Sequence, residues 1–92
     1  MAAESVVDYV LTEHLVEKLA LRNIDESLVH RVLRMPDQRF PFRAGRDVLQ
    51  SKVVIHGKAY LLRVFVDIDR YPAEVVTVYQ TSNIWKYWSE QK

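Results

Sequence analysis

The chain has 92 residues, of which 49% are hydrophobic and 27% are charged, and its net charge is +1. This length suits a single domain over residues 1–92, and this composition excludes a disordered or low-complexity chain. The sequence contains no cysteine, which excludes a disulfide framework, a thiolate zinc site and a cysteine nucleophile.

The first third of the chain predicts a strand followed by two helices. Residues 5–12 are rich in Val and Tyr and indicate a short strand. Thr12 is a typical N-cap for a helix over about 13–22, which has a broad apolar face. A second helix over 25–34 begins at an aspartate N-cap and ends before Pro36, because a residue that precedes proline avoids helical dihedrals.

The rest of the chain predicts a meander of strands. Residues 36–46 contain two prolines, a glycine and three arginines, which is typical of a loop. An alternating pattern predicts strands over 47–55, 59–69 and 74–80, and the middle one carries apolar residues on both faces, as a central strand does. A short helix over 83–88 ends the chain.

The order of these elements predicts an α+β fold, with two N-terminal helices packed on one face of a four-stranded antiparallel sheet and a short C-terminal helix. The even-numbered strand residues are expected to face the helices: Leu62, Val64, Val66, Val76 and Val78. The opposite face is then expected to carry Arg63, Thr77 and Tyr79.

The first helix carries a stripe of three basic residues. His14, Lys18 and Arg22 follow one another at intervals of four and therefore lie on one side of the helix. An imidazole that changes protonation near neutral pH, beside two fixed cations, suits general acid–base catalysis on a phosphate ester. The alternative is a solvated basic face that has no catalytic role.

Arg63 is an unusual residue for the exposed face of a central strand. Its stem is easily buried, but its guanidinium group needs an acceptor. Asp67 or Asp47 would make that acceptor structural, whereas a substrate phosphate would make it functional. Thr77 and Tyr79 supply hydroxyl groups on the same predicted face.

The predicted loop interleaves cations with aromatic rings, which suits RNA because bases stack on rings while arginines hold phosphates. The RNA-binding candidates are Arg39, Phe40, Phe42, Arg43 and Arg46. The alternative is that the two phenylalanines close the end of the core while the arginines face water.

Several other functions and locations are not expected. The three histidines are too far apart for a metal site, and neither a glycine-rich phosphate loop nor another cofactor motif is present. No apolar run approaches the ~18 residues of a membrane span, and the first residues do not resemble a signal peptide. We therefore expect a cytoplasmic protein with no metal, no cofactor and no membrane contact.

Several short phrases, spread over about residues 9–88, resemble a family of small bacterial domains related to the RelE, ParE and BrnT toxins. The phrases are Leu11-Thr12-Glu13-His14, Arg22-Asn23-Ile24-Asp25, Val32-Leu33 before Pro36, Arg63-Val64 and Val76-Thr77-Val78-Tyr79-Gln80-Thr81-Ser82. The wider group contains the ribonucleases barnase, EndoU and the colicin nucleases. The chain departs from the family pattern at Leu15, Lys18 and Asn23.

The resemblance implies a RelE-like fold and a metal-independent ribonuclease of a toxin–antitoxin system. In that chemistry the 2′-hydroxyl of RNA attacks the adjacent phosphodiester. His14 would be the general acid or base, while Arg63, Lys18 and Arg22 would balance the charge of the phosphorane. Thr77 and Tyr79 would orient it, and a cognate antitoxin would be the protein partner. The alternative is a catalytically inactive RelE-like module that binds RNA or a protein chain, with the C-terminal aromatic residues at a partner or homodimer contact.

Overall fold

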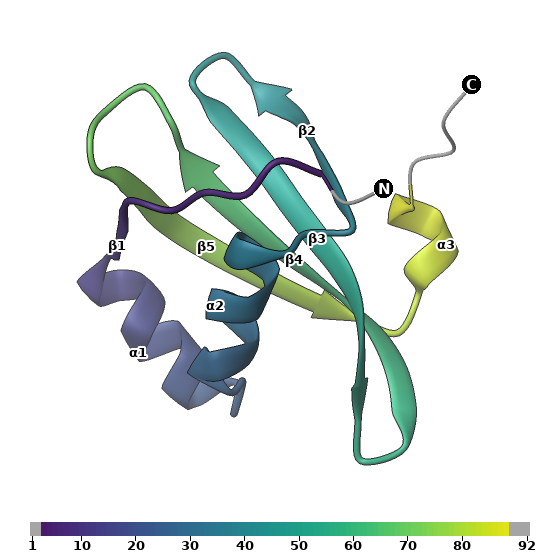
Figure 1. Ribbon diagram of the computed structural model, residues 1–92. Helices are drawn as coiled ribbons and strands as arrows, with labels where there is room; N and C mark the ends of the chain where they lie inside the picture. Colours follow the sequence, from purple (N-terminus) through teal and green to yellow (C-terminus); the bar gives the residue numbers. More distant parts are fainter. Residues whose placement is uncertain (1–2, 89–92) are drawn as a thin grey trace.

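The structure is a computed structural model that describes residues 3–88 (Figure 1). Its strands are β1 (Tyr9–Leu11), β2 (Gln38–Arg43), β3 (Arg46–Ile55), β4 (Lys58–Asp67) and β5 (Ala73–Thr81). Its helices are α1 (Glu13–Leu21), α2 (Glu26–Arg34) and α3 (Ile84–Tyr87). None of the helices in the described residues is long and apolar enough to cross a membrane.

Side-chain caps set the beginnings of α1 and α2. The Thr12 hydroxyl accepts a hydrogen bond from the backbone N–H of Leu15 at 3.2 Å. The Asp25 carboxylate accepts one from the backbone N–H of Ser27 at 2.9 Å. Each bond satisfies a backbone donor that a helix leaves free in its first turn, so both predicted N-caps are confirmed.

The five strands form one mixed sheet in the order β1-β5-β4-β3-β2, in which β1 runs parallel to β5 and the other pairs are antiparallel. The predicted four-stranded antiparallel sheet is therefore wrong. The chain leaves β1 at one edge, passes through α1 and α2, and enters the other edge as β2 (Figure 1). The predicted loop contains β2, because an edge strand tolerates Pro41 where an inner strand would lose a ladder hydrogen bond.

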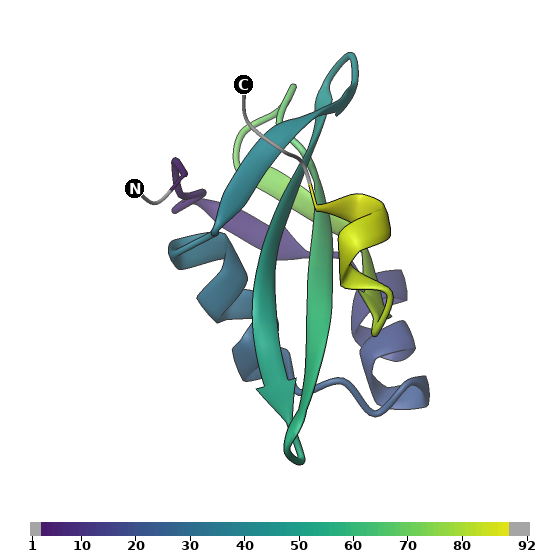
Figure 2. The same cartoon turned by 90° about the vertical axis from the view of Figure 1, so that its right-hand side faces the viewer.

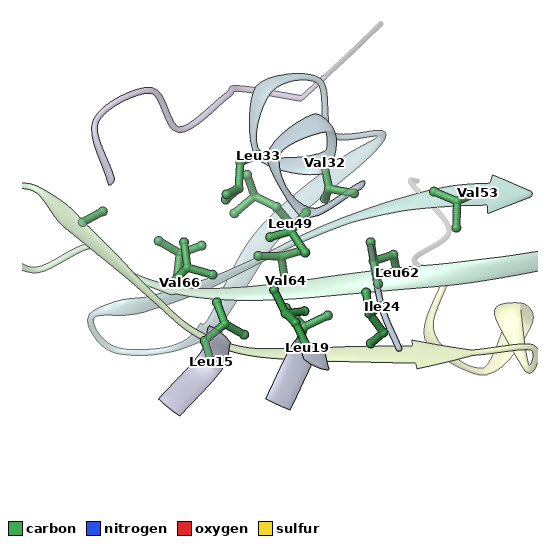
Figure 3. Packing of buried hydrophobic residues seen from close by; sticks show 14 residues of the cluster. Leu15, Leu19, Ile24, Val32, Leu33, Leu49, Val53, Leu62, Val64 and Val66 are labelled. Atoms are coloured by element: carbon green, nitrogen blue, oxygen red, sulfur yellow. The ribbon is translucent and has the colours of Figure 1, made fainter. Parts of the chain in front are cut away.

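The core lies between α1, α2 and one face of the sheet (Figure 3). Its buried residues are Leu15, Leu19, Ile24, Val29, Val32, Leu33, Leu49, Val53, Leu62, Val64, Val66, Ala73, Val75 and Val78. Val75 takes the place predicted for Val76, because the register of β4 and β5 shifts between Phe65 and Val66. One extra residue at a bulge reverses which side chains face the core.

The opposite side of the sheet, called here the second face, is partly covered by α3. Figure 2 shows α2 and α3 on opposite sides of the β3–β4 hairpin. The predicted C-terminal helix is thus present, as the single turn Ile84–Tyr87. It brings aromatic side chains onto strand residues that α1 and α2 do not reach.

Candidate functional site

A row of polar side chains crosses the second face of the sheet. Gln38 of β2 is paired with Gln50 of β3, Gln50 with Arg63 of β4, and Arg63 with Tyr79 of β5. Directly paired residues project from the same face of a sheet, so the four side chains follow one another across four strands. We call these residues the polar row.

Arg63 is the cation of the row and is buried, with 8% of its surface exposed. Its Nε donates a hydrogen bond to Gln50 Oε1 at 2.8 Å. The guanidinium carbon lies 4.5 Å from the ring centre of Tyr87 and 5.3 Å from that of Phe65. Two aromatic rings and one amide oxygen therefore hold the group, and they leave its two terminal nitrogens for another acceptor.

Gln50 orients Arg63 because its own amide is fully committed. Its Nε2 donates to Gln38 Oε1 at 2.7 Å and to the backbone oxygen of Tyr87 at 3.0 Å. The amide oxygen is consequently turned toward Arg63 Nε. Because Gln50 is fully buried, a flipped amide would leave buried donors without partners, which disfavours the alternative orientation.

No carboxylate neutralises Arg63 among the described residues. The two aspartates considered as its acceptors are engaged elsewhere: Asp47 pairs with Arg39 and Asp67 with Arg46. No described side-chain nitrogen or oxygen is both buried and without a partner, so the terminal nitrogens still reach solvent. Burial lowers the pKa of Arg63 from its high ordinary value, and the group stays charged near neutral pH.

Tyrosine side chains border Arg63 on the side of β5. The ring of Tyr79, which is 41% exposed, meets the ring of Tyr87 edge to face at 5.6 Å. The pKa of Tyr87 lies below its ordinary value, chiefly because of the Tyr79 hydroxyl and to a smaller extent because of Lys86 and Arg63. Thr77 lies on the same face, paired with Phe65.

Helix α1 is anchored along the outer edge of β5. The Thr12 hydroxyl donates to the Val75 oxygen at 3.2 Å, and Arg22 Nη1 donates to the Val78 oxygen at 3.0 Å. In the described part of the chain β1 pairs with β5 only over 73–75, so the edge beyond is open to α1. Arg22 therefore covers a carbonyl that an adjacent strand would otherwise bind.

The basic stripe of α1 reaches the second face through Arg22 alone. An open cavity of about 310 Å³ is lined by Arg22, Ile24, Tyr79 and Gln80. His14 is exposed on the same side of α1 and makes no hydrogen bond or ion pair within residues 3–88, while Lys18 is half-buried. The structure thus brings Arg22 to Tyr79, and it does not bring His14 into contact with Arg63.

The basic segment around β2 divides into two groups. Arg39 Nε donates to Asp47 at 2.8 Å, and Arg46 Nε donates to Asp67 at 2.5 Å, so both charges are satisfied inside the protein. In the second group Phe40 is half-buried and Arg43 is exposed. Phe42 is 55% exposed, and its ring meets that of Phe65 edge to face at 5.0 Å. Phe42 and Arg43 are the residues of this group that a ligand can reach.

Sequence reasoning missed Gln38, Gln50 and Lys52 as parts of this surface, and it assigned the C-terminal aromatic residues to a partner or homodimer contact and not to the surface around Arg63. Lys52 Nζ lies 4.6 Å from the ring centre of Trp85 and 4.1 Å from that of Trp88. The available signal was the parity of β3, where Gln50 and Lys52 alternate with the core residues Leu49 and Val53.

No family model, no curated protein and no solved structure matches this chain. Within the described residues no group of three or more histidine, aspartate or glutamate side chains is arranged to hold a metal ion. The reactive and ligand-binding groups that this surface presents are Arg63, the amides that hold it and the surrounding rings and hydroxyl groups.

Proposed function

We propose that this chain binds RNA through the second face of its sheet and that Arg63 holds a phosphate of the RNA. The observation that carries the proposal is the guanidinium group of Arg63, a residue that is 8% exposed, which is held by Gln50 and opposed by no carboxylate within residues 3–88. A buried cation without a counter-charge destabilises a fold, and an anionic ligand removes that cost. The two terminal nitrogens of Arg63 match the oxygens of a phosphate.

The rings around Arg63 favour RNA over an acidic peptide as the ligand. Tyr79 and Phe42 are exposed near the polar row, and Tyr87 lies against the guanidinium group. Bases stack on aromatic rings in proteins that bind single strands, while arginine contacts the backbone. A peptide carboxylate would use the arginine but would leave these rings in water.

A second candidate is the metal-independent ribonuclease of a toxin–antitoxin system. The cavity between Arg22 and Tyr79 favours it, because this cavity joins the C-terminal cation of α1 to a tyrosine hydroxyl that is paired with Arg63. The 2′-hydroxyl would attack the adjacent phosphodiester to form a cyclic phosphate while the bond from phosphorus to the 5′-oxygen of the next nucleotide breaks, and that oxygen would leave as a hydroxyl group. Arg63 would stabilise the phosphorane, and Tyr79 or Thr77 would orient it. His14 would exchange the proton if the RNA crossed the β5 edge. A cognate antitoxin would be the partner of this cytoplasmic enzyme.

RNA binding is tested with Arg63→Gln, which keeps a donor near Gln50 but removes the charge. We expect the dissociation constant for mixed-sequence RNA to rise by about 10- to 100-fold, as for loss of a charged hydrogen bond. The matched control is Arg31→Gln, at an exposed position of α2. Equal affinities of the wild type and both variants in fluorescence anisotropy, or stronger binding of an acidic peptide than of RNA, would remove the proposal.

Ribonuclease activity is tested separately with RNA and EDTA. His14→Ala should lower the cleavage rate by about 10²- to 10⁴-fold, the range for a general acid or base. His56→Ala, in the turn between β3 and β4, is the control for loss of an exposed histidine. An intact RNA after incubation with wild-type protein would leave the binding function and discard the enzyme.

A further inference from the structure

We infer that α3 is the base-binding half of this RNA site, so that the surface takes an unpaired nucleotide and discriminates against duplex RNA. The inference rests on the proposed function, since it adds a base contact and a substrate class to the phosphate contact at Arg63. It concerns Trp85, Trp88 and Lys52, to which neither the binding nor the cleavage proposal gives a role.

The access to Arg63 is narrow. One face of its guanidinium group lies against Tyr87 and Phe65 is within 5.3 Å, while Nε is used by Gln50. A phosphate must therefore approach the terminal nitrogens beside α3. A single strand is flexible enough to lay one phosphate into such a recess. A duplex presents its phosphates on a stiff, wide cylinder, which the helix would hold away from the sheet.

Trp85 offers a stacking surface next to that recess. Trp85 is 69% exposed, although apolar rings of this size are usually buried. Lys52 Nζ lies over it at 4.6 Å, and Trp88 meets it edge to face at 6.5 Å. These contacts fix the ring in place before any ligand arrives, so stacking a base on its open side costs little ordering.

The strand residues beside the two contacts, Gln50 next to Arg63 and Lys52 next to Trp85, are spaced to suit one nucleotide. Gln50, which holds Arg63, and Lys52, whose Nζ lies over the ring of Trp85, are two residues apart on β3 and project from the same face. Alternate residues of a strand are about 7 Å apart. A phosphate and its own base, separated by a sugar, span such a distance.

The base on Trp85 must be unpaired. In an A-form duplex each base is stacked between its neighbours and paired to the other strand, so its face is closed to a protein ring. Unpaired bases turn outward and stack on tryptophan or tyrosine, largely irrespective of sequence. The site is therefore expected to prefer single-stranded RNA with little preference for base identity.

The protein reports on this contact by itself, because its two tryptophans are both in this region. In a Trp88→Phe variant the fluorescence comes from Trp85. The ligands are a single strand of about eight nucleotides, its duplex, and the same backbone without bases. We expect the single strand to quench Trp85, and the duplex and the abasic strand to leave it bright.

Affinity gives the second readout. Trp85→Ala should weaken single-strand binding about tenfold, the range for one stacked base, and leave abasic binding unchanged. Tyr71→Ala, an exposed aromatic in the β4–β5 turn, is the control. Equal binding of single strand and duplex with no effect of Trp85→Ala would overturn the inference while Arg63 binding stood.

Two further outcomes are distinct. If Trp85→Ala converts a dimer into a monomer in light scattering and leaves RNA affinity unchanged, α3 is a homodimer contact and the inference is wrong. If no RNA binds and Arg63→Gln changes nothing, the proposed function itself has failed. Quenching by the single strand together with the Trp85-dependent affinity supports the inference.

Discussion

Both faces of the sheet bury leucine side chains completely, but the surroundings of these leucines differ. Leu62 and Leu61 are neighbours on β4, both fully buried, and point to opposite faces. Leu62 joins a continuous apolar cluster with α1 and α2. Leu61 instead shares its face with the polar row, which includes a charged arginine and a buried glutamine. The first face is built for stability, and the second gives up apolar contact to hold a cation.

The contrast explains why the buried charge of Arg63 lies on the second face, whereas the buried polar residue on the helix-packed side, Ser51, is neutral and accepts a hydrogen bond from the backbone N–H of Asp37. On the helix-packed side an unpaired charge would have no route to solvent. On the second face the rings of Tyr87 and Phe65 shield Arg63, and its terminal nitrogens remain accessible. Burial of this kind is typical of ligand sites, where stability is given up for binding.

The largest expected effect is on the free energy of unfolding, and it distinguishes the two leucines. Leu62→Ala should lower the free energy of unfolding by about 3–5 kcal/mol, because its cavity opens within a closely packed cluster. Leu61→Ala should cost about 2–3 kcal/mol, because the short α3 can settle into the space. Urea unfolding measures both values. Equal losses would remove the distinction between the two faces.

Removal of α3 should have the next largest effect. A chain that ends at Ser82 loses the Gln50–Tyr87 hydrogen bond and the rings around Lys52 and Arg63. We expect its free energy of unfolding to fall by about 1–3 kcal/mol, with Tm lowered accordingly. Deletion of residues 89–92 alone is the control. An unchanged Tm after both deletions would show that α3 contributes nothing to the second face.

The pH dependence of stability tests the ion pair at the end of β4. The hydrogen bond from Arg46 lowers the pKa of Asp67, so the ionised carboxylate stabilises the folded state. This stabilisation is complete above the ordinary pKa of 3.8 and is lost as the pH falls through the lower folded pKa. Asp67→Asn should cost about 1–2 kcal/mol at neutral pH and flatten the acid limb of the stability curve. If the stability of the variant fell equally steeply at acid pH, the acid dependence would come from other groups.

The smallest expected effect is on RNA affinity, and it distinguishes two arginines of β2. Arg43→Gln should weaken RNA binding by about two- to threefold, because its exposed charge is free to meet a phosphate. Arg39→Gln should leave the affinity unchanged and lower stability, since its charge already pairs with Asp47. Anisotropy at two salt concentrations measures the first, and thermal unfolding the second. The reverse order would show that the ion pair opens for the ligand.

Local signals predicted the helices and the alternation of the strands. Thr12 and Asp25 cap helices whose beginnings depend on neighbours in the sequence. The parity of β4 correctly separates Arg63 from Val64. These features follow from short-range chemistry, which a single sequence contains.

Pairing between distant segments could not be predicted in the same way. The parallel contact of β1 with β5 depends on the path through α1 and α2, and the exchange of Val76 for Val75 depends on a bulge opposite Phe65. In the candidate site, Arg63 and Tyr79 were placed on a shared face from parity alone. Parity alone could have placed Gln50 on the same face, but its hydrogen bonds to Arg63 and Gln38 depend on the pairing of strands that are distant in the sequence.

The most direct test of the central claim is thermal unfolding of the wild type and an Arg63→Met/Gln50→Leu variant, with and without single-stranded RNA. The double replacement removes the buried charge, which favours folding, and also the hydrogen bonds from Gln50 to Gln38 and Tyr87, which opposes it, so the variant should unfold close to the wild-type Tm without RNA. RNA at about 100 times its wild-type dissociation constant should stabilise the wild type by about 2.7 kcal/mol, and the variant, which binds about 10- to 100-fold more weakly, by only about 0.4–1.4 kcal/mol. A variant that is strongly destabilised, beside a wild type that RNA does not stabilise, would show that Arg63 is structural and would contradict the account.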